Sequence, residues 1–154
     1  NDAAFVIQWH LLGMFVPSFF TGHLINRFGV LPIITTGTLL TAFCVAVNVS
    51  GIGLAQFWVA LVALGIGWNF MFIGGTTMLT ETYEISEQAK VQAANDFLVF
   101  GTVAVASLSS GVLFNKIGWH GVNLTIIVPV VIMLTVSLWF RFSNSPSVSA
   151  ERSP

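Results

Sequence analysis

Residues 17–30 read PSFFTGHLINRFGV and join two long apolar runs. Within this segment Gly22 and Gly29 frame the polar pair Asn26-Arg27, and Arg27 is the only basic residue in the first half of the chain. A turn between two membrane spans places polar groups and cations in water at one bilayer surface. The segment therefore indicates a chain that crosses a membrane more than once.

The composition of the whole chain indicates the same class. Of its 154 residues, 55% are hydrophobic and 7% are charged, and the mean hydropathy is +0.88. A soluble domain has roughly a quarter charged residues, so this chain has too little polar surface for a soluble fold. The net charge of -1 provides no basic field for nucleic acid. The single cysteine, Cys44, excludes a disulfide within the chain.

A helix that spans a bilayer needs about 20 mostly apolar residues. Five runs approach or exceed this length: residues 4–25, 31–50, 54–79, 91–114 and 122–140. We therefore expect an all-α membrane protein in which residues 1–142 form a bundle of about five transmembrane helices. Residues 143–154 are rich in Ser, Pro and charge, which predicts a disordered cytoplasmic tail.

The basic residues predict an orientation. If the five spans alternate in direction, Arg27, Lys90, Arg141 and Arg152 share one side and Lys116 lies alone on the other. Lys and Arg concentrate in cytoplasmic loops, so the first side is expected to face the cytoplasm. This pattern is typical of a multi-pass protein of the inner or plasma membrane.

Two segments of the chain echo each other. Residues 22–29 read GHLINRFG and residues 111–118 read GVLFNKIG, so each has Asn and a basic residue between two glycines. The segments lie three spans apart and on opposite predicted membrane faces. An inverted repeat of three helices predicts this relation, and such repeats build many transporters. The alternative is that the pattern is simply common where spans end.

The spacing of Gly22, Asn26, Arg27 and Gly29 resembles the loop signature of the major facilitator superfamily, Gly-x-x-x-Asp/Asn-Arg-x-Gly-Arg/Lys. The chain departs from this signature after Gly29, where apolar residues 30–31 replace the basic residues. The resemblance implies a twelve-helix transporter made of two six-helix bundles, in which this loop closes a cytoplasmic turn. It also implies secondary transport of a small solute by alternating access.

The resemblance further implies where the chain belongs in such a transporter. Residues 101–111, GTVAVASLSSG, lack the proline that the superfamily has in its fifth helix. We therefore interpret the chain as about helices eight to twelve, the C-terminal half without its first helix. A sequence that begins with Asn1 rather than Met fits a fragment. The expected partners are the lipid bilayer, the N-terminal bundle of the same protein and a small solute.

Polar residues inside the predicted spans are candidates for a solute or coupling site, because hydrocarbon offers them no hydrogen-bond partner. Trp68 provides a flat ring, and Asn69 beside it provides an amide that can orient a solute. Thr76 follows Asn69 by seven residues and shares its helix face. The alternative is that Asn69 only joins two helices by a hydrogen bond.

Two titratable residues are further candidates for coupling. Asp96 lies within the fourth span, where a carboxylate is costly and is expected to face the bundle interior or water. It is able to bind a proton and couple its movement to the solute, or else to pair with Lys90 or Arg27. His10 is able to titrate near neutral pH, but it also fits a role in the interface or in a hydrogen bond between helices.

A stripe of small residues in the fourth span predicts helix packing, because small side chains let two helices approach closely. Its members are Gly101, Ala104, Ser107 and Gly111. No phosphate-binding loop, zinc-protease motif or serine-hydrolase motif occurs, so we expect neither catalytic residues nor a cofactor or metal. The alternative to a transporter is a non-transporting membrane subunit whose helices serve packing or assembly only.

Overall fold

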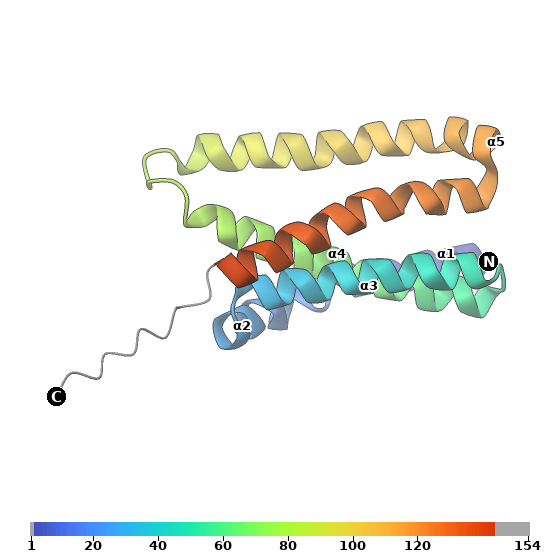
Figure 1. Cartoon of the computed structure of the whole chain (residues 1–154), viewed down its shortest axis with the longest axis horizontal. Coiled ribbons are helices and arrows are strands. Elements are labelled where there is room, and N and C mark those ends of the chain that lie inside the picture. Colours follow the sequence, from blue (N-terminus) through green and yellow to red (C-terminus); the bar gives the residue numbers. More distant parts are fainter. Residues whose placement is uncertain (1, 144–154) are drawn as a thin grey trace.

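The computed structural model describes residues 2–143, which form helices joined by short connections. The elements are α1 (Asp2–Phe15), α2 (Ser18–Phe28), α3 (Val30–Ser50), α4 (Leu54–Thr80) and α5 (Gln88–Ser143). The helices run back and forth along the long axis of the molecule (Figure 1). Apart from Ser143, the predicted tail lies outside the described residues.

The described helices are long and apolar enough to form a membrane bundle. By length and hydropathy α3, α4 and α5 each qualify as membrane-spanning, and α1 and α2 qualify together as one span bent by 41°. The element α5 consists of two helices that meet at Gly118, the point where its backbone leaves the helical conformation. The expectation of an all-α membrane fold is therefore confirmed.

The helices extend beyond the apolar runs that the sequence marks. The first run corresponds to two helices, because the helix is interrupted at residues 16–17. The polar stretch 115–121 is helical on both sides of Gly118 rather than an open loop. A turn of one residue suffices there because glycine adopts a conformation that other residues avoid.

The two echoing segments share this turn geometry. Gly29 has φ 88° and ψ 162°, and Gly118 has φ 66° and ψ −175°. They are the two glycines with positive φ among the described residues. Each is the last residue of its segment and joins two helices directly, and the two turns lie at opposite ends of the bundle (Figure 1). The shared geometry supports the inverted-repeat interpretation.

The helix α4 forms the centre of the packed part, with α1 on one side and α3 on the other. A Cβ atom added to Gly67 would lie 2.8 Å from the Gly37 carbonyl oxygen of α3, and one added to Gly37 would lie 2.7 Å from the Gly67 carbonyl oxygen. On the other side, a Cβ at Gly65 would collide with the carbonyl of His10 in α1. Glycine is therefore required for both helix crossings.

The two parts of α5 have different surroundings. In the second part, Asn123, Val130 and Ser137 are buried at seven-residue intervals, which places one stripe of this helix against its neighbour. Trp119 anchors its start, because its Nε1 donates a hydrogen bond of 3.1 Å to the Asn48 carbonyl of α3. In contrast, most side chains of residues 93–117 are exposed in this chain.

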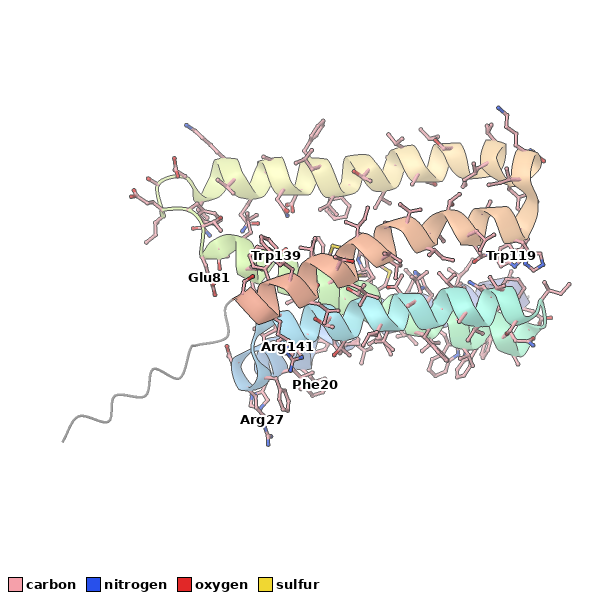
Figure 2. All side chains as sticks on the ribbon, viewed as in Figure 1. Phe20, Arg27, Glu81, Trp119, Trp139 and Arg141 are labelled. Carbon is pink, nitrogen blue, oxygen red and sulfur yellow. The ribbon has the colours of Figure 1, made fainter. Side chains whose placement is uncertain are left out.

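Most of the described charged residues lie at one end of the bundle. Figure 2 shows Arg27, Glu81 and Arg141 at the same end, and Trp119 at the opposite end. Lys90, at the start of α5, belongs to the end with the arginines, and Lys116 belongs to the turn at Gly118. The described basic residues therefore have the asymmetry that the sequence predicts, while Arg152 lies outside the described residues.

Replacing either turn glycine by alanine should destabilise the fold. Both backbones occupy a region of φ and ψ that is essentially restricted to glycine, so Gly29→Ala and Gly118→Ala should each lower the free energy of unfolding by about 1–3 kcal/mol. Thermal unfolding of the purified chain in detergent measures the change.

The first glycines of the same two segments provide matched controls. Within residues 2–143, a Cβ added to Gly22 or Gly111 meets no atom within 4 Å. Gly22→Ala and Gly111→Ala should therefore be neutral or stabilise the helix by up to about 1 kcal/mol. Equal destabilisation by the turn variants and the control variants would contradict the strain argument.

Candidate functional site

The break between α1 and α2 is the first feature of the site. Pro17 has no backbone N–H, so it cannot donate the helical hydrogen bond to the Gly13 carbonyl, and the two helices bend by 41°. The chain resumes its helical pattern when the backbone N–H of Thr21 donates to the Pro17 carbonyl at 2.8 Å. The bend leaves polar backbone groups inside a span, where they need other partners.

Asn69 of α4 supplies these partners. Its Nδ2 donates to the Met14 carbonyl at 2.7 Å and to the Ser18 hydroxyl at 2.6 Å. The Thr21 hydroxyl lies 2.6 Å from Asn69 Oδ1 and 2.8 Å from the Pro17 carbonyl oxygen, so its one proton is shared between two acceptors. We call this group, formed by Asn69, Met14, Ser18 and Thr21, the helix-break clamp.

The clamp uses the whole hydrogen-bonding capacity of the Asn69 donors. Asn69 is 3% exposed, and Thr21 is fully buried. Both protons of the amide and its oxygen have partners within the protein, so none of them is left for a solute in this conformation. The geometry therefore favours the structural interpretation of Asn69, in which it joins α4 to the bent span.

His10 also joins α1 to α4. Its Nδ1 lies 2.8 Å from the Leu61 carbonyl oxygen, which requires the proton to be on Nδ1. The half-buried ring lies beside the close crossing of Gly65 and the His10 carbonyl. This arrangement favours a hydrogen bond between helices over a coupling role for His10.

Trp68 lies on a different face of α4 and packs with two further aromatic residues. Trp68 and Phe72 stack with their ring centroids 5.9 Å apart and an interplanar angle of 12°. Phe72 in turn contacts Phe100 of α5, with centroids 6.1 Å apart. Thr76 follows Phe72 by one helical turn, and Asp96 precedes Phe100 by one turn. We call the three rings the aromatic row.

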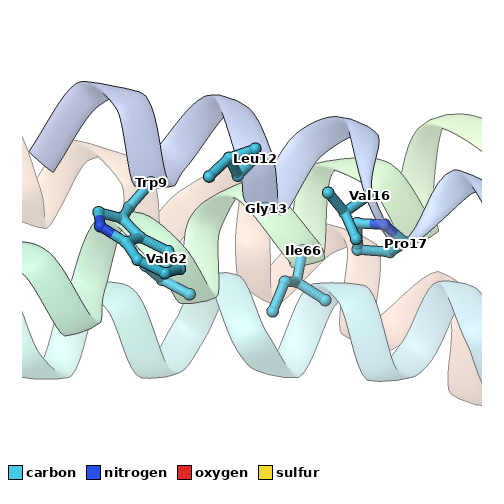
Figure 3. A pocket seen from close by; sticks show the side chains of 7 residues that line it. All are labelled: Trp9, Leu12, Gly13, Val16, Pro17, Val62 and Ile66. Atoms are coloured by element: carbon cyan, nitrogen blue, oxygen red, sulfur yellow. The ribbon is translucent and has the colours of Figure 1, made fainter. Parts of the chain in front are cut away.

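An apolar cavity of about 250 Å³ lies between α1 and α4 (Figure 3). Its lining consists of side chains from the two helices and the break between α1 and α2: Trp9, Leu12, Gly13, Val16, Pro17, Val62 and Ile66. Apart from the indole of Trp9, these residues carry no side-chain hydrogen-bonding group. The cavity suits a hydrocarbon chain or an apolar side chain and lacks groups to orient a polar solute.

Comparison with known proteins decides the family. A family model for the Major Facilitator Superfamily matches residues 2–153, which is nearly the whole chain. The chain belongs to this superfamily. Membership agrees with the all-α membrane fold, and the relatives of the chain bear the names of transporters rather than of enzymes.

Three relatives belong to the same superfamily. The chain is 48% identical to the riboflavin transporter RfnT of Brucella anthropi over 141 residues, which cover 92% of the chain and 35% of that protein. It is 30% identical to each of two uncharacterised superfamily transporters of Bacillus subtilis, YddS and YdeG, over 91% and 88% of the chain and 33% and 32% of those proteins. The chain thus spans about a third of the length of these relatives. No solved structure matches the chain.

The residues of the superfamily loop signature lie where α2 ends. Asn26 and Arg27 are exposed in the last turn, and Gly29 makes the sharp turn into α3. The guanidinium of Arg27 lies 5.4 Å from the centroid of the Phe28 ring. Nothing lies within 4 Å of the position of a Cβ at Gly22, so its close helix contact stays a prediction.

The small-residue stripe has no neighbour among the described residues. Positions for Cβ atoms at Gly101 and Gly111 are open, and Ala104 and Ser107 are exposed. Within the chain, close crossings use other glycines instead. Packing by this stripe therefore stays a prediction, and it would need a helix from outside residues 2–143.

Sequence reasoning did not identify several residues that the structure brings together. Ser18 and Thr21 were missed as partners of Asn69, although Pro17 predicts a bend whose backbone polar groups need hydrogen-bond partners nearby. Phe72 and Phe100 were missed as neighbours of Trp68. The four-residue step from Trp68 to Phe72 was a visible signal, because it places both rings on one helix face.

Removing the amide of Asn69 should loosen the bend. Asn69→Ala deletes two donors and one acceptor that serve the clamp, and each such bond inside a membrane contributes about 0.6–2 kcal/mol. The free energy of unfolding should therefore fall by about 1–3 kcal/mol. Thermal unfolding in detergent measures the loss of stability.

Asn123→Ala is the matched control for this variant. Asn123 is equally buried, but its Nδ2 donates to the Trp119 carbonyl one turn earlier in the same helix. Its loss removes no side-chain hydrogen bond to another described helix and should cost less than the loss of Asn69. A larger cost for Asn123→Ala would mean that the clamp does not stabilise the bend.

Proposed function

We propose that the chain forms part of a secondary transporter that moves a small solute across a membrane by alternating access, and that riboflavin is the solute. The identity of 48% with a riboflavin transporter over 92% of the chain carries this proposal. Alternating access means that two helical bundles rock about a site between them. The energy would come from an ion gradient or from the gradient of the solute.

The exposed face of α5 supports the need for a facing bundle. Residues 93–117 present large apolar side chains such as Phe97 and Leu108, which are 78% and 83% exposed in this chain. In a membrane such a face meets lipid or another helix. We propose that the stripe from Gly101 to Gly111 packs against the remaining bundle of the transporter, and that Arg27 and Arg141 mark the cytoplasmic side of an inner or plasma membrane.

The uptake of riboflavin by a chimera tests this proposal. In the chimera, this chain replaces the matching segment of the Brucella anthropi transporter, and a riboflavin-auxotrophic bacterial host supplies the assay. Uptake of radiolabelled riboflavin should rise well above that of the host with an empty vector, because the helices of the segment are expected to complete the solute path. The unmodified Brucella transporter is the positive control.

A second result would favour the alternative, in which the helices serve assembly only. If the chimera reaches the membrane in an amount equal to that of the unmodified transporter and takes up no riboflavin, the proposed solute is wrong for this segment. A quantitative blot of isolated membranes separates this outcome from a failure of insertion.

A further inference from the structure

We propose that the aromatic row, together with Thr76 and Asp96, binds a flat fused-ring solute that carries hydroxyl groups. The inference rests on the proposed function, because it names the part of the transporter that holds the solute. It assigns stacking to the three rings and hydrogen bonding to the two polar side chains. No side chain of the helix-break clamp takes part.

The aromatic row offers a stacking surface that joins two helices. Trp68 and Phe72 lie nearly parallel, with an interplanar angle of 12°, and Phe100 extends the row from α5. Trp68 and Phe72 are half-buried, and Phe100 is 56% exposed, so ring area remains accessible on all three. Aromatic faces attract other flat π-systems in offset or tilted arrangements.

Two contacts join the first part of α5 to α4 and to the segment after it. Gln92 donates from its Nε2 to the hydroxyl of Tyr83, in the segment after α4, at 2.7 Å, and Phe100 contacts Phe72. Gln92, Asp96 and Phe100 follow each other at four-residue steps, which places them along one helix face. Asp96 lies midway between the two contacts, one turn from each, and its side chain is exposed in this chain.

Thr76 occupies the corresponding level on α4. The two helices run antiparallel (Figure 1), so one turn after Phe72 and one turn before Phe100 lie on the same side of the Phe72–Phe100 contact, each one turn away from it. Among the described residues, the Thr76 hydroxyl has no hydrogen-bond partner, and Asp96 has one long contact of 3.4 Å with its neighbour Asn95. A Cβ added to Gly75 meets no atom of the described residues within 4 Å, so space exists beside Thr76 within this part of the chain.

These two side chains are suited to hydroxyl groups at the edge of a ring system. A carboxylate accepts hydrogen bonds from hydroxyls, and such charge-assisted bonds are stronger than neutral ones. A threonine hydroxyl both donates and accepts. A carboxylate inside a span is costly without a partner, so the hydroxyls of a bound solute would stabilise Asp96 as well as orient the solute.

Two probes separate the ring from the hydroxyls. Riboflavin has a fused three-ring system with a polyhydroxyl chain, and lumiflavin has the same rings with a methyl group in place of that chain. Binding to the purified chimera in lipid nanodiscs is followed by the quenching of flavin fluorescence. Phe100→Ala should weaken the binding of both probes by about tenfold, the order expected for the loss of one stacking partner.

Asp96→Ala should act on one probe only. It should weaken riboflavin binding by about tenfold, because a hydrogen bond to a charged group is lost, and should weaken lumiflavin binding much less. Phe97→Ala is the matched control for Phe100→Ala. Phe97 lies on the same helix, is 78% exposed, and has no ring contact among the described residues, so its removal should leave the affinity of both probes within about twofold.

The results distinguish the site from the function. If the unmodified chimera binds riboflavin and Phe100→Ala behaves like Phe97→Ala, the proposed site is wrong while the proposed function stands. A loss of lumiflavin binding in Asp96→Ala equal to the loss of riboflavin binding would overturn the assignment of Asp96 to the hydroxyls. If the inserted chimera binds neither probe, both the function and the site are wrong.

Discussion

The need to satisfy backbone polar groups inside hydrocarbon is the constraint on which this structure depends. A continuous helix meets it within its own backbone, but Pro17 interrupts the first span and frees polar groups at the bend. The amide of Asn69 reaches across from α4 to the Met14 carbonyl and the Ser18 hydroxyl. Because these bonds join the two sides of the break to one residue of α4, they set the position of the bent span relative to the centre of the bundle.

The helix α4 contacts a different neighbour with each of its faces. Gly65 and Asn69 lie four residues apart and contact α1 and the break after it. Gly67 meets Gly37 of α3 at backbone distance. Trp68 and Phe72 point to the remaining side, where Phe100 approaches. The size and polarity of single side chains on this apolar helix thus determine which neighbour each face contacts.

The sequence predicted the helical membrane fold and the family, because hydropathy and the Asn-basic-x-Gly pattern are local signals. It did not predict which polar side chains have hydrogen-bond partners within the folded chain. Asn69 and Thr76 share a face by their seven-residue spacing. Asn69 has hydrogen-bond partners around the break at Pro17, whereas the Thr76 hydroxyl has none among the described residues. That difference depends on the bend of another helix, which residue spacing within α4 does not contain.

The contacts that join α4 to α1 and α3 differ in kind from those that join it to the first part of α5, and this difference affects how the helices can move. The helix α4 is held against α1 and α3 by backbone approaches that any added Cβ would block and by directional hydrogen bonds. The tilted contact of Phe72 with Phe100 joins it to the first part of α5, and the Gln92–Tyr83 bond joins α5 to the segment after α4. Ring contacts tolerate sliding and tilting because dispersion is not directional. A movement of α5 relative to α4 would therefore meet least resistance at the aromatic row. A solute ring bound there would be released by the same movement, because it separates Phe72 from Phe100.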